Sequence, residues 1–451
     1  MAPVPWASAA LLLIASAAFL ATPAVLAQAV QERNKAVRPI KTTPTKAKAV
    51  APAKTAPKAV NKAANKATPA LKRVAAVAPL AVRDGDAEAR LIDIYRLIGQ
   101  ARQREALAKA ESLVSDNPNF QLAQLVYGDL LAGRTRPVRT LGDVPDTTAQ
   151  AAAPQLAELR QESLQRLRAL RERPTPGTLP SQFLTLSPRV KHAIAVDTSR
   201  SRLYLFENGV DGLRLLSDYY ISVGKSGTEK TLEGDLRTPL GVYFVTGNLD
   251  PKSLRDFYGA GALPINYPNQ LDVKRGKTGG GIWLHGTPPT QFARAPLSTD
   301  GCVVLANPDL MRVIKTVEIR TTPVVIAQNL KWVAPHSVKA DSKSFEDAFS
   351  AWQAAKSSGD ITRLMPWYAT DFSSYGKTLT EWTPAMQAEL KQLVGRSVQL
   401  KDVSYLRWTD GADTMVVTFG ELVQGAKTGR TKRQYWTRQG NQWKIFFEGV
   451  I

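Results

Sequence analysis

Two short apolar runs that end at glycine constrain the fold of this chain more than any other feature. The first, Ile282–Leu284, leads into His285 and a glycine, and the second, Val303–Leu305, follows Gly301 and Cys302. Apolar runs of this length next to glycine are typical of short buried strands. Reactive side chains are commonly displayed where such rigid elements end. The pattern therefore predicts a site that contains the histidine and the cysteine.

The candidate chemistry is that of a cysteine nucleophile. Cys302 is the only cysteine in 451 residues, and His285 is one of three histidines. A free thiol with a pKa of about 8.5 is only about 3% thiolate at neutral pH, so an imidazole that takes its proton makes it an acyl acceptor. Gly301 lacks a Cβ, which lets the backbone turn sharply and aim N–H groups at a carbonyl oxygen.

The alternative for Cys302 is an inert buried thiol. The export signal described below favours the nucleophile, because an unpaired cysteine in an oxidising compartment is a liability unless it has a use. One cysteine and three dispersed histidines do not form a metal-ligand set, so we expect no metal and no cofactor. For His192, in a predicted strand, and His336, in a predicted interdomain linker, we expect structural roles.

The spacing of these residues resembles the signature of the L,D-transpeptidase (YkuD-type) catalytic domain, a histidine followed by a variable segment and then Ser/Thr-His-Gly-Cys. Here His285 stands seventeen positions before Cys302, and the segment closes with Thr-Asp-Gly-Cys. Residues 233–243 (EGDLRTPLGVY) are similar to the R/K-T-P-x-G-x-Y strand entry of that family. The resemblance covers residues 188–331 and implies a mainly-β catalytic domain.

The resemblance also implies residue roles. Cys302 would be the nucleophile, His285 the proton donor and acceptor, and Gly301 part of the loop that holds the oxyanion. Arg237 and Thr299 would contact the substrate.

Two positions depart from the family pattern. Asp300 stands where a second histidine is usual, and Val304 where an arginine is often found. A carboxylate cannot replace a neutral imidazole as both donor and acceptor. We therefore expect Asp300 to act, if at all, as an orienting residue that accepts a hydrogen bond from His285 or the nearby backbone.

The family implies a peptidoglycan stem peptide as substrate. Cys302 would attack the L-configured carbonyl of meso-diaminopimelate in the bond to D-alanine. The acyl-enzyme would pass to an amine, giving a 3-3 crosslink or attaching a protein to the wall, or to water, as in an L,D-carboxypeptidase that trims tetrapeptides to tripeptides. We favour the amine, with a role in cell wall organisation and cell shape. A non-catalytic wall-binding protein, its site decayed at Asp300 and Val304, is the other alternative.

The N-terminal part carries export and charge signals. Residues 1–27 contain an apolar run and small-residue cleavage sites typical of a signal peptide, which predicts the periplasm or cell envelope; an uncleaved anchor is the alternative. Residues 28–83 hold nine Lys and four Arg against one Glu in a chain of net charge +20, and lack aromatics. We expect a disordered linker that associates with anionic envelope surfaces or is only a spacer. The exported context argues against nucleic acid.

Residues 84–172 show helical apolar spacing and predict a helical domain. One segment resembles a single tetratricopeptide unit, without a second copy. A single unit leaves an apolar face uncovered, so we expect a neighbouring domain or, in a homodimer, a second protomer to cover it.

Residues 340–451 change to two long helices followed by four strand-like runs, which predicts an α+β cone. The closing Trp-Lys-Ile-Phe-Phe-Glu-Gly is similar to the last strand of the nuclear-transport-factor-two-like (SnoaL-like) fold. The expected fold class is thus multidomain: a helical N-terminal part, a mainly-β catalytic domain and a C-terminal cone. This arrangement resembles that of bacterial cell-shape L,D-carboxypeptidases.

Overall fold

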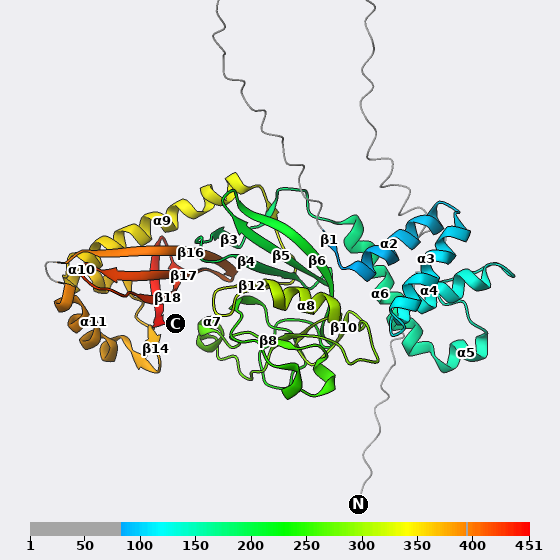
Figure 1. The fold of residues 1–451 in the computed structure, drawn as a ribbon. Helices are drawn as coiled ribbons and strands as arrows, with labels where there is room; N and C mark the ends of the chain where they lie inside the picture. Colours follow the sequence, from blue (N-terminus) through cyan, green and yellow to red (C-terminus); the bar gives the residue numbers. More distant parts are fainter. Residues whose placement is uncertain (1–82, 394–395) are drawn as a thin grey trace, which may run out of the picture.

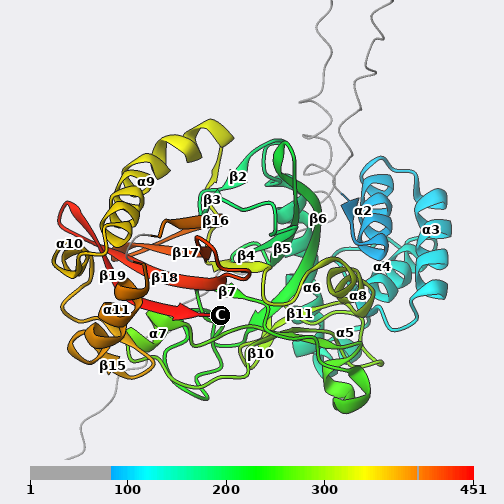
Figure 2. The same ribbon diagram turned by 60° about the vertical axis from the view of Figure 1, so that its left-hand side comes forward.

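The computed structural model describes residues 83–393 and 396–451, which form a helical region, a large sheet and a C-terminal α+β domain (Figures 1 and 2). The predicted multidomain fold class is confirmed. The predicted signal peptide and nearly all of the predicted linker lie outside the described residues. Within them, no helix has the length and apolar character needed to cross a membrane.

The helical region lies at one end of the molecule (Figure 1). Its helices are α2 (Asp86–Gly99), α3 (Gln103–Asp116), α4 (Gln121–Ala132), α5 (Asp146–Ala151) and α6 (Ala153–Arg171). The apolar spacing that predicted the first three brings their buried side chains into one core.

The apolar face of the helices packs against the catalytic region of the same chain. Phe120, before α4, stacks on Phe292 with ring centroids 4.2 Å apart. Tyr220 and Ala306 of the catalytic region belong to the same buried cluster. The expected neighbour is therefore an intrachain domain, and the uncovered face no longer argues for a second protomer.

A buried ionic cluster joins the helices to the sheet. Glu88 of α2 accepts hydrogen bonds of 2.6 and 2.7 Å from Arg202, and Arg166 of α6 lies 3.0 Å from the same carboxylate. Burial alone would raise the pKa of Glu88, but the two arginines lower it to about 2. Burying a charge is costly unless it is paired, so these contacts favour one position of α2 against the sheet.

The catalytic region is built on a curled sheet in the strand order β7-β12-β4-β5-β6-β11-β9-β8, with β1 and β10 also paired to β6. The strands are β1 (Arg83–Asp84), β4 (His192–Asp197), β5 (Arg202–Gly209), β6 (Gly212–Gly224), β7 (Gly241–Phe244), β8 (Ala262–Pro264), β9 (Trp283–His285), β10 (Leu297–Thr299), β11 (Val303–Leu305) and β12 (Pro323–Ala327). Helices α7 (Gln270–Lys274) and α8 (Asn307–Thr316) and the 3-10 turns η1 (Pro251–Ser253) and η2 (Asp256–Tyr258) complete it. Arg83, assigned to the linker from the sequence, pairs with Ser217 in β6.

Each face of this sheet has its own core. One face contains Ile194, Leu205 and Leu284 and is covered by Leu310 and Val313 of α8. The opposite face contains Ala195, Tyr204 and Val325 and packs against side chains of the C-terminal domain. The alternation of side chains along the strands produces these two cores.

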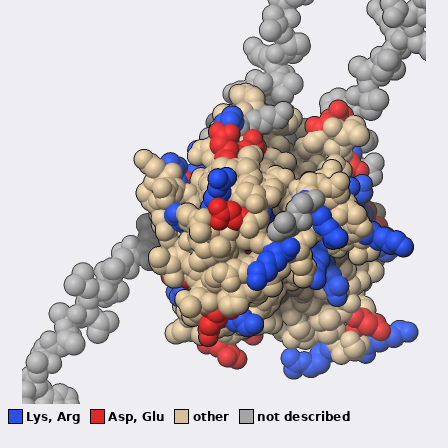
Figure 3. Space-filling model, turned by 90° about the vertical axis from the view of Figure 1, so that its left-hand side faces the viewer, with Lys and Arg blue, Asp and Glu red and all other residues tan. Residues whose placement is uncertain are grey.

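The C-terminal domain wraps long helices around a second sheet, of order β19-β18-β17-β16-β3. Its elements are β3 (Phe183–Thr185), α9 (Pro335–Ser357), α10 (Ile361–Leu364), η3 (Met365–Trp367), β14 (Ser373–Ser374), β15 (Lys377–Thr378), α11 (Leu379–Leu393), β16 (Val398–Asp410), β17 (Ala412–Val423), β18 (Arg430–Gln439) and β19 (Gln442–Val450). A further small pair joins β2 (Leu179–Pro180) to β13 (Trp332–Val333). Basic side chains gather on part of the outer face of this domain (Figure 3).

The sequence analysis misplaced one feature here and missed another. His336 lies in the first turn of α9 rather than in a linker; the helix begins at Pro335, a residue that suits a first turn although it reads as a break in the sequence. β3, which precedes the catalytic region in the chain, pairs with β16 of the C-terminal sheet. A strand that joins a sheet formed by a distant part of the chain cannot be predicted from the local sequence pattern.

Candidate active site

The two predicted chemical residues meet on neighbouring parallel strands. In the pairing of β9 with β11, Leu284 lies opposite Val303 and His285 opposite Val304. Cys302, one residue before that register, therefore lies across from Trp283. Because side chains alternate between the two faces of a sheet, Cys302 and His285 lie on the same face as diagonal neighbours.

The His285 imidazole is buried and held in one tautomer. Its Nδ1 lies 2.7 Å from the carbonyl oxygen of Gly286, so Nδ1 carries the proton and Nε2 keeps its lone pair. The ring of Tyr258 packs edge-on at 5.0 Å and that of Phe257 lies at 5.9 Å. Burial lowers the pKa of His285 to about 4. The residue is thus a neutral base at physiological pH.

The Cys302 thiol is also neutral at rest. It donates to the carbonyl oxygen of Gly281 at 3.5 Å, and the backbone N–H of Trp283 points to the sulfur. Burial raises the pKa of Cys302 to about 11, more than that N–H and the charge of Arg294 lower it. No hydrogen bond joins the thiol to His285 in the described part of the chain. The structure therefore holds a thiol and an imidazole rather than an ion pair, and the proton must move when the sulfur attacks.

The turn before Cys302 is held by two threonines. The Thr299 hydroxyl donates to the carbonyl oxygen of Cys302 at 2.7 Å and accepts from the N–H of Gly301 at 3.1 Å. Thr238, of the predicted strand-entry motif, donates to the carbonyl oxygen of Gly301 at 2.9 Å. Gly301 has φ +127°, and a Cβ there would lie 2.7 Å from the carbonyl oxygen of Arg237. Only glycine fits this position.

These contacts change the expected roles of two residues. The N–H of Gly301 is taken by Thr299 and so is not free to hold an oxyanion. The N–H of Cys302 makes no hydrogen bond to any described residue, which leaves it as the better donor. Thr299 is 2% exposed and uses its hydroxyl on the backbone, so it shapes the turn rather than contacting a substrate.

Asp300 and Arg237 lie on the rim of the site. The exposed Asp300 carboxylate forms an ion pair of 2.9 Å with Lys225 and does not contact His285. The expected hydrogen bond from His285 goes instead to the carbonyl oxygen of Gly286. Arg237 is exposed and donates to the carbonyl oxygen of Thr228 at 2.9 Å.

Asn307, at the start of α8, braces the loop behind His285. Its Oδ1 accepts from the N–H groups of Ala260 (2.9 Å) and Thr287 (3.2 Å), and its Nδ2 donates to the carbonyl oxygen of Thr287 (2.8 Å). A Cβ at Gly286 would lie 2.0 Å from this Oδ1, which is why the backbone can approach so closely only at a glycine. The sequence analysis missed Asn307 as a positioning residue.

Arg294 is the other residue that the sequence analysis missed. It lies between His285 and Cys302 in the chain and is 8% exposed. Its charge lowers the pKa of both His285 and Cys302. Arg294 therefore places a positive charge near the site, although the arginine usual two positions after the cysteine is absent, and the charge of Asp300 opposes its effect on the pKa of Cys302.

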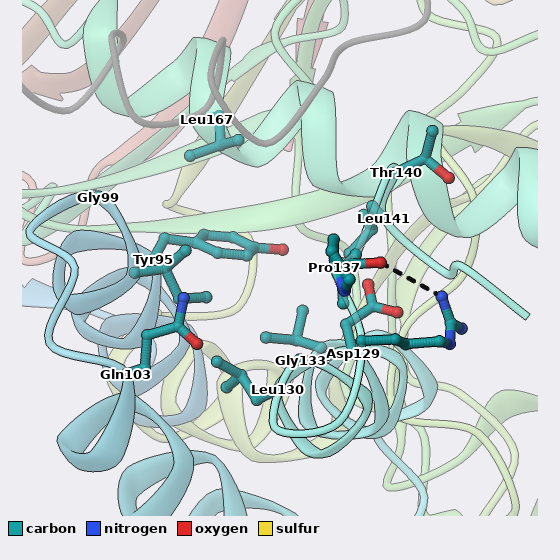
Figure 4. A pocket seen from close by; sticks show the side chains of 14 residues that line it. Tyr95, Gly99, Gln103, Asp129, Leu130, Gly133, Pro137, Thr140, Leu141 and Leu167 are labelled. Atoms are coloured by element: carbon teal, nitrogen blue, oxygen red, sulfur yellow. Dashed lines mark hydrogen bonds between the residues drawn. The ribbon is translucent and has the colours of Figure 1, made fainter.

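A cavity of about 210 Å³ lies away from this site, in the helical region (Figure 4). Tyr95, Leu130 and Leu167 form an apolar wall that Asp129 faces, and Arg136 is also among the lining residues. The Asp129 carboxylate already accepts from the N–H groups of residues 142 and 143. It holds a loop rather than performing chemistry.

Comparisons with known proteins identify the domains. Residues 191–326 match the L,D-transpeptidase catalytic domain (YkuD), and residues 344–449 match the Cds6 C-terminal NTF2-like domain. The chain thus contains an L,D-transpeptidase catalytic domain joined to a C-terminal NTF2-like domain, and the predicted resemblance is confirmed. No curated protein sequence matches the chain.

Solved structures resemble parts of this chain. Bd1075 from Bdellovibrio bacteriovorus is 24% identical, with a TM-score of 0.52 over 60% of this chain and 98% of that one. The helical cell shape determining protein Pgp2 from Campylobacter jejuni is 20% identical, with a TM-score of 0.49 over 60% and 95%. An L,D-transpeptidase from Mycobacterium smegmatis is 12% identical, with a TM-score of 0.21 over 31% and 59%. The likeness to Bd1075 shows a shared fold.

Proposed function

We propose that the protein is a peptidoglycan L,D-transpeptidase that acts on stem peptides through an acyl-enzyme on Cys302. The observation that carries the proposal is the pairing of Cys302 and His285 on one face of β9 and β11 inside a domain of this family. The family acts on the cell wall, so we place the protein in the envelope, exported by the predicted signal peptide.

The neutral pair dictates the order of proton transfers. Nε2 of His285 takes the thiol proton as the sulfur attacks the carbonyl of the L-centre, since Nδ1 is occupied by Gly286. The carbonyl oxygen becomes an oxyanion that the N–H of Cys302 is placed to receive. The imidazolium then gives its proton to the departing amine, and a thioester remains on Cys302. General acid–base transfer of this kind contributes about 10²- to 10⁴-fold in rate.

The acceptor of the acyl group separates two candidate reactions. An amine from a second stem gives a crosslink, whereas water gives a tripeptide, as in an L,D-carboxypeptidase. The match of residues 344–449 to the Cds6 C-terminal domain favours water, because the whole arrangement resembles cell-shape L,D-carboxypeptidases. The catalytic-domain family as a whole favours an amine as the acceptor.

The deciding experiment incubates the purified protein with disaccharide tetrapeptides and resolves the products by mass. Crosslinked dimers support transpeptidation, and disaccharide tripeptides support carboxypeptidation. Unchanged substrate with a folded protein would favour the non-catalytic wall-binding alternative. A Cys302→Ala variant is the matched control and should yield neither product.

The basic N-terminal segment is proposed to hold the enzyme on anionic envelope polymers. Deleting residues 28–82 should leave turnover of soluble muropeptides unchanged and weaken retention on sacculi at low salt. Retention that is insensitive to salt would remove this electrostatic proposal, because exposed charges are screened as ionic strength rises.

A further inference from the structure

Arg294 carries a buried charge without an acidic partner. The residue is 8% exposed, and its guanidinium makes one long hydrogen bond, 3.4 Å from Nη2 to the carbonyl oxygen of Phe257. No carboxylate of the described residues forms an ion pair with it. Burying an arginine is costly unless a negative charge compensates, so this guanidinium is suited to bind an anion.

The backbone around Arg294 is fixed independently of its side chain. The carbonyl oxygen of Arg294 accepts hydrogen bonds from Tyr220 (2.8 Å) and Ser222 (2.9 Å). Two residues earlier, the N–H of Phe292 donates to the carbonyl oxygen of Asn119 in the helical region at 3.0 Å. The arginine is thus presented by a rigid segment, and changing its side chain leaves these anchors in place.

The guanidinium packs on the ring of Phe257, which also lies next to the imidazole of His285. Its Cζ lies 4.4 Å from the centre of the Phe257 ring, and that ring lies 5.9 Å from the imidazole of His285. The positive charge acts on both His285 and Cys302. Asp300 is an acidic side chain whose charge acts on Arg294, but its carboxylate is paired with Lys225 at 2.9 Å.

Arg433 is another buried arginine and serves as a structural comparison. Arg433, in the interface between the sheets, packs on the ring of Phe244 and donates to the hydroxyl of Thr418 at 3.0 Å. It lies away from the reacting groups. The combination of a missing ion-pair partner and a place on the Phe257 ring, next to His285, singles out Arg294.

We propose that Arg294 is a specificity-determining residue that binds a carboxylate of the molecule Cys302 attacks. The inference deepens the proposed function, on which it rests for the identity of the substrate. A stem tetrapeptide offers two carboxylates near the scissile bond, that of the terminal D-alanine and that on the D-centre of diaminopimelate. Arginine suits either, because its planar fork matches carboxylate geometry.

A probe that is independent of peptidoglycan tests the anion site itself. Iodoacetate and iodoacetamide alkylate the same thiol and differ in one carboxylate, so their rate ratio cancels any change in thiolate content. We expect Arg294→Gln to lower the iodoacetate to iodoacetamide ratio about tenfold relative to the wild type, the effect of losing one charged hydrogen-bonded contact. Arg294→Lys should restore part of the ratio. The matched control is Arg255→Gln, at an exposed arginine two residues before Phe257, which should leave the ratio unchanged.

An equal ratio in the wild type and Arg294→Gln would overturn the proposal. If Arg294→Gln does not fold, the wild type alone decides: its ratio should exceed that of a free thiol such as glutathione and fall with added salt. A ratio no higher than that of glutathione would also overturn it.

Two amidated tetrapeptides then identify which carboxylate is bound. If Arg294 reads the terminal D-alanine, amidating that group should raise KM about tenfold in the wild type and have little effect in Arg294→Gln. If it reads the diaminopimelate carboxylate, the peptide amidated there should behave in this way. If turnover is normal and neither amidation changes KM in the way described, the Arg294 proposal alone is contradicted. If no peptide is turned over but the alkylation ratio still depends on Arg294, only the proposed function is contradicted.

Discussion

The alkylation rate of Cys302 should keep rising at pH values well above those at which the rate of a thiolate–imidazolium pair levels off. A pKa of about 11 leaves about one molecule in 10⁴ as thiolate at pH 7. A free cysteine with a pKa of about 8.5 is about 3% thiolate at that pH. Cys302 should therefore react with iodoacetamide about 300-fold more slowly than free cysteine at pH 7, and the rate should rise about tenfold per pH unit up to pH 10.

The assay is simple because the chain has a single cysteine, so intact-protein mass reports one adduct. Rates are measured between pH 6 and pH 10, with urea-unfolded protein giving the free-thiol reference in the same chain. His285→Ala should show the same slope, since no ion pair is lost. A rate that is already constant between pH 6 and pH 8 would refute the neutral pair and indicate a thiolate held by an imidazolium.

Substitutions at three further positions test the surrounding structure. Asn307→Ala removes three hydrogen bonds from the loop behind the histidine, so it should lower the free energy of unfolding by about 2 kcal/mol and also lower turnover. Asn307→Asp keeps the acceptor oxygen and should have a smaller effect. Equal effects of the two variants in urea titrations would contradict the bracing role. Glu88→Gln removes the carboxylate shared by Arg202 and Arg166, leaves Arg202 with Asp218 at 3.3 Å, and should cost about 3 kcal/mol in the same titration; a loss below about 1 kcal/mol would show that the cluster does not hold α2. Asp300→Asn breaks only an exposed pair with Lys225 and should change turnover less than about threefold; a tenfold fall with a shifted acid limb would restore the orienting role.

Local patterns predicted much of the fold. The glycine-bounded apolar runs became β9 and β11, and the first of the two long helices predicted within residues 340–451 became part of α9. Helix α8 was missed, because it starts at Asn307 directly after a strand and its Pro308 reads as a break in the pattern although proline suits the first turn of a helix.

The sequence predicted the chemistry of the site better than its electrostatics. The motif placed Cys302 and His285 together, but burial, which is set by segments distant in the chain, decides that both are neutral. Arg294 and Asn307 were out of reach because their contacts span 37 and 47 residues, and no periodicity connects such positions.

The central claim is that a stem peptide becomes attached to Cys302 during turnover. Purified protein mixed with a disaccharide tetrapeptide and quenched in acid within the first turnovers should show, by intact mass, a covalent addition equal to the substrate without its terminal D-alanine. Peptide mapping should locate it on Cys302, and His285→Ala should not accumulate it. Turnover that persists in Cys302→Ala, or that proceeds in the wild type with no covalent addition at any quench time, would contradict the account.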